Sequence, residues 1–151
     1  MGQLSFRYAR PSDLSDLNYI SIAAKKHWGY PQDWIDRWMS DLRVTEKDLA
    51  ERIVLLAEAD HEVVGFTIVS DCRDYYEIDH LWILPKYIGR GYGRQLLVWT
   101  MEHFLTQVKR LIVVADPNAE GFYKKMGFET YDKIESYPPG RFLPVMELTS
   151  S

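Results

Sequence analysis

Hydrophobic and polar residues at the start of the chain first alternate and then follow a longer period. Residues 3–9 alternate weakly, which predicts a short strand. Ser12 is then predicted as the N-cap of a helix. Leu14, Leu17 and Ile20 fall on one face of that helix, so we expect this face to pack on a core.

A second helix is predicted after a break at residues 27–30. Pro31 suits its first turn, because the N–H that proline lacks has no partner within a helix at that position. The helix then carries one broad apolar face, formed by Trp34, Ile35, Trp38, Met39 and Leu42. Further on, Thr45 and Asp48 have the spacing of a capping box and predict a short third helix.

The middle of the chain changes to strand-like runs. Residues 53–59 and 63–69 are apolar runs separated by a polar turn, which predicts a β-hairpin. A third run, 75–84, is longer and stops at Pro85. These neighbouring runs favour antiparallel strands in the middle of a sheet.

The second half of the chain mixes both periods. An amphipathic helix is predicted over 94–109, with its apolar face formed by Leu96, Leu97, Met101, Phe104, Leu105 and Val108. A buried strand follows at 111–115, and then a helix over 118–126 that ends at Gly127. Residues 128–133 and 141–148 supply two last strands. The order predicts an α/β fold, with a central mixed sheet of seven strands and helices on both faces.

The composition indicates one soluble, folded domain over residues 1–151. Aromatic residues make up 14% of the chain, which provides ample apolar surface to bury. The net charge of −4 lacks the basic field of a nucleic-acid binder, and the single Cys72 cannot form an internal disulfide or a Cys-rich zinc site. No apolar run approaches the roughly 20 residues that span a bilayer. We therefore expect a cytoplasmic protein without a metal, a nucleic acid or a membrane as partner.

A glycine-rich loop lies between the third run and the long helix. It consists of Gly89, Arg90, Gly91, Tyr92, Gly93 and Arg94. Small residues let the backbone approach a ligand, and a helix N-terminus favours an anion. A phosphate or pyrophosphate is expected here, with the two arginines adding charge-assisted hydrogen bonds. A turn without a ligand is the alternative, and the spacing fits neither a P-loop nor a dinucleotide fingerprint.

Two segments together resemble the GNAT family of N-acetyltransferases. The run Leu81-Trp82-Ile83-Leu84-Pro85 followed by the glycine-rich loop looks like the acetyl-CoA-binding motif of that family. Residues 116–128 are similar to its late motif, N…Y…GF. The order of the two motifs and of the predicted elements matches the family over essentially the whole chain. Stretches at 27–30 and 139–141 are similar to those of an uncharacterised bacterial branch of the family.

The resemblance implies acetyl-CoA as the cosubstrate and no metal. In the family two central strands splay apart, and the pantetheine arm bonds to backbone groups that correspond to Leu81, Trp82 and Ile83. The glycine-rich loop would hold the pyrophosphate. One departure is Ile88, which stands where the family commonly has Gln or Arg. A second is that Asp116 takes the usual place of the family asparagine, so Asn118 and Asp116 are both candidates for the cofactor contact.

The implied reaction is direct attack of an amine on the thioester. Tyr123 matches the general acid of the family, since a phenol with a pKa of about 10 is protonated at pH 7. A tyrosine that only packs the helix on the sheet is the alternative. Glu77 matches a glutamate that the family often uses as the base, directly or through water. His80 competes with Glu77, because its reference pKa of about 6.5 suits a base.

Simple alternation along the third run assigns its side chains to two faces. Glu77, Asp79, Leu81 and Ile83 are predicted on one face. Ile78, His80, Trp82 and Leu84 are predicted on the other face. Glu77, Asp79 and His80 can also be solvated or structural residues rather than a base.

The acceptor side is predicted from two further segments. The aromatic break at 27–30 corresponds to a variable acceptor loop of the family, and residues 136–141 would face it. An aromatic pocket can hold an amine by cation–π contact, and a lid that only packs is the alternative. The implied acceptor is a primary amine of a small molecule or peptide.

Two other functions remain open from the sequence. One is a non-catalytic acyl-CoA-binding or sensing domain on the same fold. The other is an interaction module built on the aromatic helix over residues 34–42, with a homodimer as its mildest form.

Overall fold

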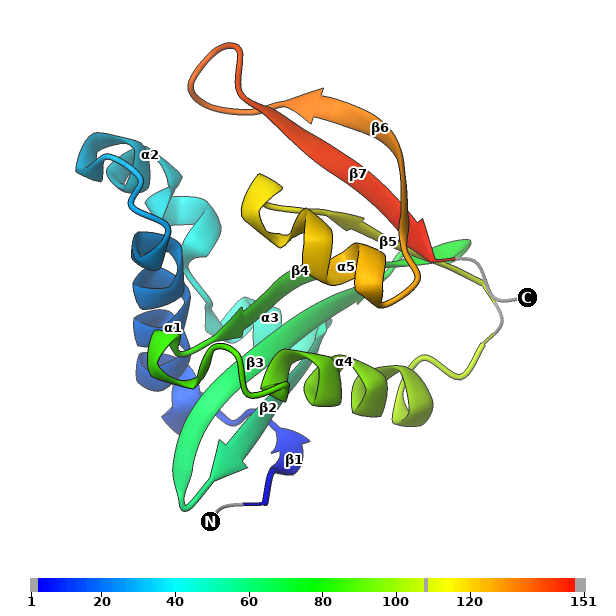
Figure 1. Cartoon of the computed structure of the whole chain (residues 1–151). Helices are drawn as coiled ribbons and strands as arrows, with labels where there is room; N and C mark the ends of the chain where they lie inside the picture. The colour runs from blue at the N-terminus through cyan, green and yellow to red at the C-terminus, as the bar shows by residue number, and fades with distance from the viewer. Residues whose placement is uncertain (1–2, 108, 149–151) are drawn as a thin grey trace.

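The computed structural model describes residues 3–107 and 109–148, and these form a seven-stranded mixed sheet with helices on both faces (Figure 1). The strands are β1 Ser5–Tyr8, β2 Ile53–Ala59, β3 Glu62–Asp71, β4 Tyr75–Ile83, β5 Arg110–Val114, β6 Glu129–Glu135 and β7 Phe142–Leu148. The helices are α1 Leu14–His27, α2 Gln32–Leu42, α3 Glu46–Glu51, α4 Tyr92–His103 and α5 Glu120–Lys125, with 3₁₀ turns η1 Pro11–Asp13, η2 Pro85–Tyr87 and η3 Pro117–Ala119.

The strands lie in the order β1-β2-β3-β4-β5-β7-β6. All neighbouring strands are antiparallel except β4 and β5, which run parallel with α4 as the connection between them. This confirms the predicted α/β fold and the hairpin of β2 and β3. In the described part of the chain, none of the helices has the length and apolarity to cross a membrane.

Each face of the sheet has its own apolar core. On one face, Leu97 of α4 and Tyr123 of α5 pack against Ile78 and Val113 of the two parallel strands. On the other face, α1 packs through Leu17 and Ile20 on β2 and β3. The apolar face of α2 (Ile35, Trp38 and Leu42) is itself buried against neighbouring aromatic side chains, so it is used within the chain.

The parallel pairing of β4 and β5 covers only the first half of β4. It runs from Tyr75 opposite Arg110 to Ile78 opposite Val113, although β4 continues to Ile83. Beyond Ile78, β4 remains paired only with β3. Residues 79–83 therefore present one unpaired backbone edge at the point where β4 and β5 diverge.

A β-bulge lies at the same place. Ile68 of β3 pairs with His80, but the next residue, Val69, pairs with Ile78, so Asp79 is an extra residue on β4. The bulge reverses the predicted faces of the residues before it. Ile78 packs on the α4–α5 face rather than beside His80, and Glu77 consequently lies on the α1 face.

The predicted faces hold beyond the bulge. Trp82 and Leu84 pack with the core under α1, and Leu81 packs on the α4–α5 face. The error before the bulge arose because alternation assumes an unbroken strand, and nothing in the sequence marks the extra residue.

Some predicted boundaries are wrong, and each has a local cause. Ser12 is not the N-cap, because the Asp13 carboxylate accepts the Arg10 N–H (2.7 Å) and is itself bound by Arg7. The helix predicted over 94–109 is α4, which begins at Tyr92 and ends at His103; Val108 lies outside the described residues. The helix predicted over 118–126 is split into η3 and α5. The capping box of Thr45 and Asp48 is confirmed at α3.

Gly65 of β3 provides a test of how closely β4 is held. A Cβ at this position would lie 2.7 Å from the carbonyl oxygen of Trp82 and would also meet the Ile83 side chain. We expect Gly65→Val to destabilise the protein by about 1–3 kcal/mol, because the backbone of β4 must shift. Urea unfolding measures the loss.

Gly121→Ala is the matched control. Gly121 is exposed in α5, and no heavy atom lies within 4 Å of the position that a Cβ would take, so this change should be neutral or slightly stabilising. Equal free energies of unfolding for the two variants would contradict the close approach of β3 and β4.

Candidate active site

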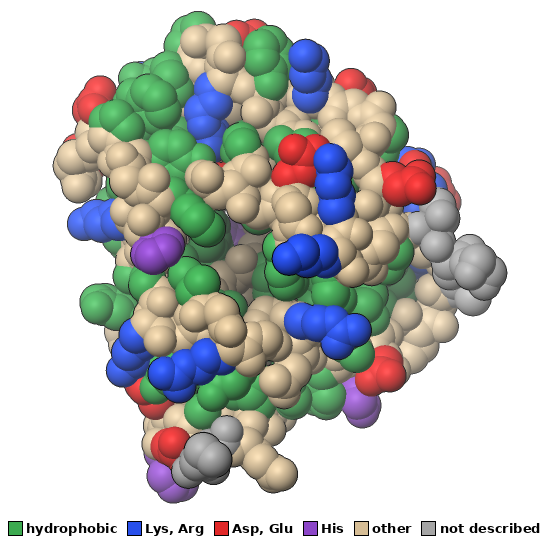
Figure 2. Space-filling view, in the orientation of Figure 1, with side chains coloured by type: hydrophobic (Ala, Val, Ile, Leu, Met, Phe, Trp, Pro, Cys, Tyr) green, Lys and Arg blue, Asp and Glu red, His purple; other side chains and the backbone are tan. Residues whose placement is uncertain are grey.

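The opening between β4 and β5 is the centre of the candidate site, and side chains reach it from both faces of the sheet. Figure 2 shows the surface hollowed between α1 and α5, with Lys and Arg side chains around the hollow. Because the strands diverge, the edge of β4 over residues 79–83 has backbone groups that no strand pairs. Such groups need water or a ligand as partner.

The glycine-rich loop lies at the end of this edge. Gly91 is the N-cap of α4 and has a φ of +79°, a left-handed conformation that glycine adopts without strain. The first hydrogen bond within α4 is donated by the Gln95 N–H to the Gly91 carbonyl oxygen (3.1 Å). The N–H groups before Gln95 therefore have no acceptor within the helix. This end of α4 can therefore receive an anion.

Arg90 and Arg94 add positive charge to the same loop. Both side chains are exposed, and neither forms an ion pair with a carboxylate in the described part of the chain. The guanidinium of Arg90 lies 5.1 Å from the centre of the Tyr87 ring. The sequence-predicted loop residues are thus brought together at one helix end.

Tyr123 lies on the α4–α5 face of the sheet, in the core that includes Ile78 and Val113. Its side chain is 4% exposed and packs between Phe122 and Phe128. The hydroxyl makes no hydrogen bond with the described residues, yet none of their fully buried polar side-chain atoms lacks a partner, so solvent reaches this oxygen. Burial raises the pKa of the Tyr123 phenol well above its usual range, which keeps the proton on it at neutral pH.

Glu77 and His80 lie on the opposite face, under α1. Burial, and then the neighbouring Asp79 carboxylate, raise the pKa of Glu77 above its usual value. His80 accepts a hydrogen bond at Nδ1 from the indole N–H of Trp82 (2.9 Å). The neutral ring then carries its proton on Nε2, so neither nitrogen has a free lone pair to accept a proton. Burial also lowers the pKa of His80.

A polar cluster with three largely buried charged side chains, which the sequence did not predict, lies on the acceptor side of the opening. We call the side chains of Lys25, Tyr30, Asp116, Asn118 and Arg141 the Asp116 cluster. Lys25 Nζ donates to Asp116 Oδ2 (2.6 Å), and the Tyr30 hydroxyl donates to Asp116 Oδ1 (2.9 Å). Arg141 Nη2 donates to the Tyr30 oxygen (3.1 Å) and lies 3.4 Å from Asp116 Oδ2.

The Asp116 cluster joins segments that are far apart in the sequence. It links the end of α1, the loop before α2, the segment after β5 and the loop before β7. The Trp38 indole N–H also donates to the Tyr137 carbonyl oxygen (3.2 Å). The hydrogen bond from Arg141 to Tyr30 confirms that residues 136–141 face the aromatic break. Trp28, in contrast, is exposed, and its ring meets that of His27 edge to face.

The charges within the Asp116 cluster oppose one another. Burial alone would raise the pKa of Asp116, but Lys25, Asn118 and Tyr30 outweigh this effect and the pKa lies below its usual value. For Lys25, burial and the repulsion from Arg141 outweigh the attraction of Asp116, and its pKa is lowered. The Asp116 carboxylate is thus the ion-pair partner of both Lys25 and Arg141.

Asp116 and Asn118 are both members of the cluster. The Asn118 amide donates to the Tyr30 oxygen (2.9 Å) and to Asp116 Oδ1 (3.0 Å). Lys25 was missed although the sequence holds a signal for it. It continues the buried face of α1 formed by Leu17, Ser21 and Ala24, where a lysine needs a buried partner.

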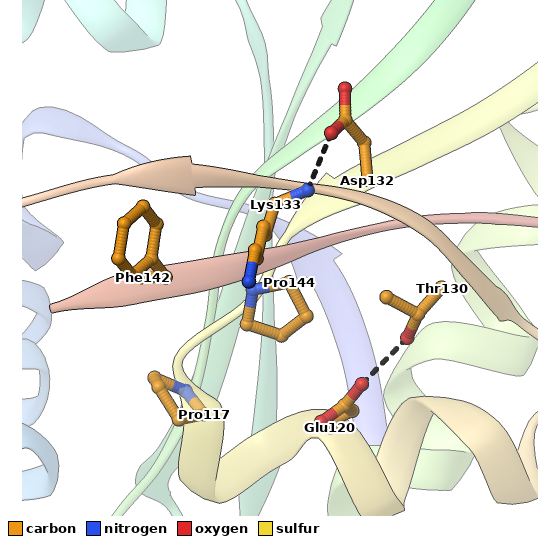
Figure 3. A pocket seen from close by; sticks show the side chains of 7 residues that line it. All are labelled: Pro117, Glu120, Thr130, Asp132, Lys133, Phe142 and Pro144. Atoms are coloured by element: carbon orange, nitrogen blue, oxygen red, sulfur yellow. Dashed lines mark hydrogen bonds between the residues drawn. The ribbon is translucent and has the colours of Figure 1, made fainter.

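A separate shallow pocket of about 510 Å³ lies between α5 and the β6–β7 hairpin (Figure 3). Its polar groups are already engaged, since Thr130 donates to Glu120 (2.6 Å) and Lys133 lies over the Phe142 ring. It contains none of the predicted site residues. Among the described residues, no group of three or more His, Cys, Asp or Glu side chains could hold a metal ion.

The mixed sheet that opens between β4 and β5, with a glycine-rich loop at the end of the opening, is the fold of the GNAT acyltransferases. The profile of the acetyltransferase (GNAT) domain matches residues 50–130, more than half of the chain. The chain belongs to the GNAT family.

Particular relatives support the same assignment. An uncharacterized N-acetyltransferase of Methanocaldococcus jannaschii is 26% identical over 125 residues, which are 75% of this chain and 50% of that protein. The ribosomal protein bS18 alanine N-acetyltransferase of Haemophilus influenzae is 29% identical over 82 residues, or 52% of this chain and 56% of that protein. The chain thus spans about half the length of the curated relatives it matches.

Solved structures agree on the fold. The PaiA N-acetyltransferase of Thermoplasma acidophilum, solved with coenzyme A, superposes with a TM-score of 0.83 at 21% identity, over 98% of this chain and 99% of that one. Naa50 of Arabidopsis thaliana, in complex with a bisubstrate analogue, gives a TM-score of 0.70 at 22% identity, over 97% and 99% of the two chains.

The Asp116 cluster predicts a specific stability defect. Asp116→Asn removes the only carboxylate of the cluster and leaves two buried cations without a counter-charge, so we expect a loss of about 3–5 kcal/mol at pH 7. Because the pKa of Asp116 is lower in the folded state, its contribution is present above the unfolded pKa of about 3.9 and is lost as the pH falls through the folded value. The difference in the free energy of unfolding between wild type and variant should therefore shrink at acidic pH.

Unfolding by urea at a series of pH values measures both effects. Asp71→Asn is the matched control, since it removes an exposed carboxylate that pairs with Lys109 at the surface and should change stability much less. A gap that stays constant between pH 7 and pH 3 would contradict a buried, ionised Asp116.

Proposed function

We propose that this chain is an acetyl-CoA-dependent N-acetyltransferase that acetylates a primary amine of a small molecule or peptide by direct attack in a ternary complex. The observation that carries the proposal is the unpaired edge of β4 between two chemically distinct sides. One side ends in an anion site with Tyr123, and the other holds Glu77 and the Asp116 cluster. Membership of the GNAT family adds to this, as do the neighbours solved with coenzyme A or acetyl-CoA.

The loop fits the diphosphate of coenzyme A. Gly89, Gly91 and Gly93 keep side chains away from the backbone N–H groups, while Arg90 and Arg94 supply charge that has no partner within the described chain. Leu81, Trp82 and Ile83 would hold the pantetheine arm through their backbone, much as a further strand would pair. The side chains of Asn118 and Asp116 lie instead in the Asp116 cluster on the acceptor side, where they bond to Tyr30.

Acetyl-CoA supplies the activated acetyl thioester. Tyr123 holds a proton that it can give to the leaving thiolate, because burial keeps its phenol protonated. Glu77 accepts the proton of the attacking amine, directly or through water. Its raised pKa makes it a stronger base than an exposed glutamate, and His80 is committed to Trp82. The two residues therefore handle protons on opposite faces of the same opening.

The proposed acceptor class includes peptide amines. Naa50 of Arabidopsis thaliana was solved with the bisubstrate analogue CoA-Ac-MVNAL, and the Haemophilus influenzae relative is named for a ribosomal protein alanine. Both names support a peptide amine for this chain.

Tyr123→Phe tests the proposed general acid. We expect a fall in kcat of about 10²–10⁴-fold in a CoA-release assay with an amine panel, because the leaving thiolate loses its proton donor. Coenzyme A affinity and stability should persist, since the phenyl ring keeps its packing and the hydroxyl has no partner among the described residues. Tyr19→Phe, at an exposed tyrosine of α1, is the control and should match wild type.

The same assay separates the alternatives. Unchanged activity in Tyr123→Phe would remove the acid assignment. A wild-type protein that binds coenzyme A but acetylates no amine would instead be a non-catalytic acyl-CoA-binding domain.

Glu77→Gln tests the proposed base through the pH profile. A base works when it is deprotonated, so the kcat/KM of wild type should rise as the pH increases through the raised pKa of Glu77. We expect the variant to lose this acid limb and about 10²-fold or more in kcat/KM. The control Glu51→Gln, at the exposed end of α3, should keep the acid limb and the wild-type kcat/KM. A retained acid limb in Glu77→Gln would assign the base to another group.

A further inference from the structure

The Asp116 cluster carries more positive than negative charge. Lys25, Arg141 and Asp116 have side chains that are only 11%, 12% and 8% exposed, and within the described residues they form ion pairs only with one another. Two cations therefore share one carboxylate, which leaves a surplus of one positive charge. A buried charge without a counter-ion is costly. An anion from outside the chain would relieve that cost.

The aromatic faces of the cluster are already covered by these two cations. Lys25 Nζ lies 4.4 Å from the centre of the Trp38 ring and 5.1 Å from that of Tyr30. The Arg141 guanidinium lies 4.5 Å and 5.0 Å from the same two rings. Tyr30 was expected to hold a cationic amine by cation–π contact, but its ring is already in contact with cationic side chains of the chain itself. A cationic ligand would meet repulsion here.

Arg141 also keeps donors for a ligand. Nη2 donates to Tyr30 and lies near Asp116, and Nη1 reaches Ser136 Oγ at 3.4 Å. Nε has no hydrogen-bond partner among the described residues. Since none of their fully buried polar side-chain atoms lacks a partner, Nε faces solvent. Guanidinium donors held in place by packing suit the two oxygens of a carboxylate.

The cluster lies beside the reacting centre. Lys25 Nζ bonds to Asp116 after β5 and lies 5.9 Å from the centre of the Trp82 ring on β4, so it bridges the two strands where they diverge. An acceptor must enter from this face, because the glycine-rich loop and Tyr123 occupy the other. A group bound by Arg141 would therefore belong to the acceptor.

We propose that the acceptor is an amine that also carries a carboxylate, and that the carboxylate binds Arg141 beside Lys25. This inference rests on the proposed acetyltransferase function and names its substrate class. Arg141 is a specificity-determining residue in this arrangement, and Lys25 and Tyr30 position it. The amine of the acceptor is left free to face Glu77.

The test compares acceptors matched in length but not in charge. The panel contains 4-aminobutanoate, 4-aminobutanamide and 1,4-diaminobutane, together with the corresponding acid, amide and diamine one and two methylenes shorter. CoA release with saturating acetyl-CoA gives kcat/KM for each. For at least one chain length, we expect the kcat/KM of the acid to exceed that of its amide by tenfold or more. The diamine should have the lowest kcat/KM of the three. Melting temperatures of the CoA-bound protein with each compound give a second ranking that needs no turnover.

Variants link that preference to Arg141. Arg141→Gln should abolish the preference mainly through KM, and Arg141→Lys should retain part of it, because the charge remains but the planar fork is lost. Arg43→Gln, at an exposed arginine after α2, should keep the wild-type preference. A lower melting temperature of Arg141→Gln would reveal any loss of fold. In that case the test is whether Arg141→Lys has a reduced preference for acids.

The outcomes separate this inference from the proposed function. Failure to bind coenzyme A would contradict the function itself. A protein that binds coenzyme A but acetylates amides or diamines as well as acids would contradict only the inference. Equal melting temperatures with all compounds and no difference in rate would also overturn it, as would a preference for acids that survives in Arg141→Gln.

Discussion

The separation of β4 from β5 is the constraint on which the rest of the structure depends. Parallel pairing stops at Ile78 and Val113, in the middle of a sheet whose two faces are both covered. Backbone groups at such a place cannot remain buried without partners. The bulge at Asp79 accommodates the divergence on the β3 side, while α5 and the end of α1 close the opening from the two faces. The candidate site is thus a consequence of a sheet that is left incomplete.

The bulge also decides which residues can act together. Without it, Glu77 would lie beside Leu81 on the α4–α5 face, where Tyr123 already is. With it, Glu77 shares the α1 face with His80 and Trp82. The proposed base, Glu77, and the proposed acid, Tyr123, then lie on opposite faces of the sheet. The bond between His80 and Trp82 removes the competing base by fixing its tautomer.

Much of the fold could be predicted from the sequence because it follows from local patterns. The hairpin of β2 and β3, the capping box at Thr45 and the end of α5 at Gly127 each depend on a few neighbouring residues. The glycine-rich loop was found for the same reason. The bulge at Asp79 and the contacts of Lys25 could not be found in this way, because they depend on partners far along the chain. The face of Glu77 and the Asp116 cluster needed the three-dimensional structure.

Both sides of the candidate site carry positively charged side chains, although the net charge of the chain is −4. Arg90 and Arg94 are exposed at the loop, where water screens them and an anion can displace it. Arg141 and Lys25 are largely buried, so their charges are screened much less. The exposed pair, Arg90 and Arg94, suits the binding and release of a highly charged diphosphate. The buried pair suits discrimination between small molecules, because an unmatched charge there has no water to compensate it. In the proposed function, cofactor binding on one side and acceptor selectivity on the other are thus separated by burial rather than by the sign of the charge.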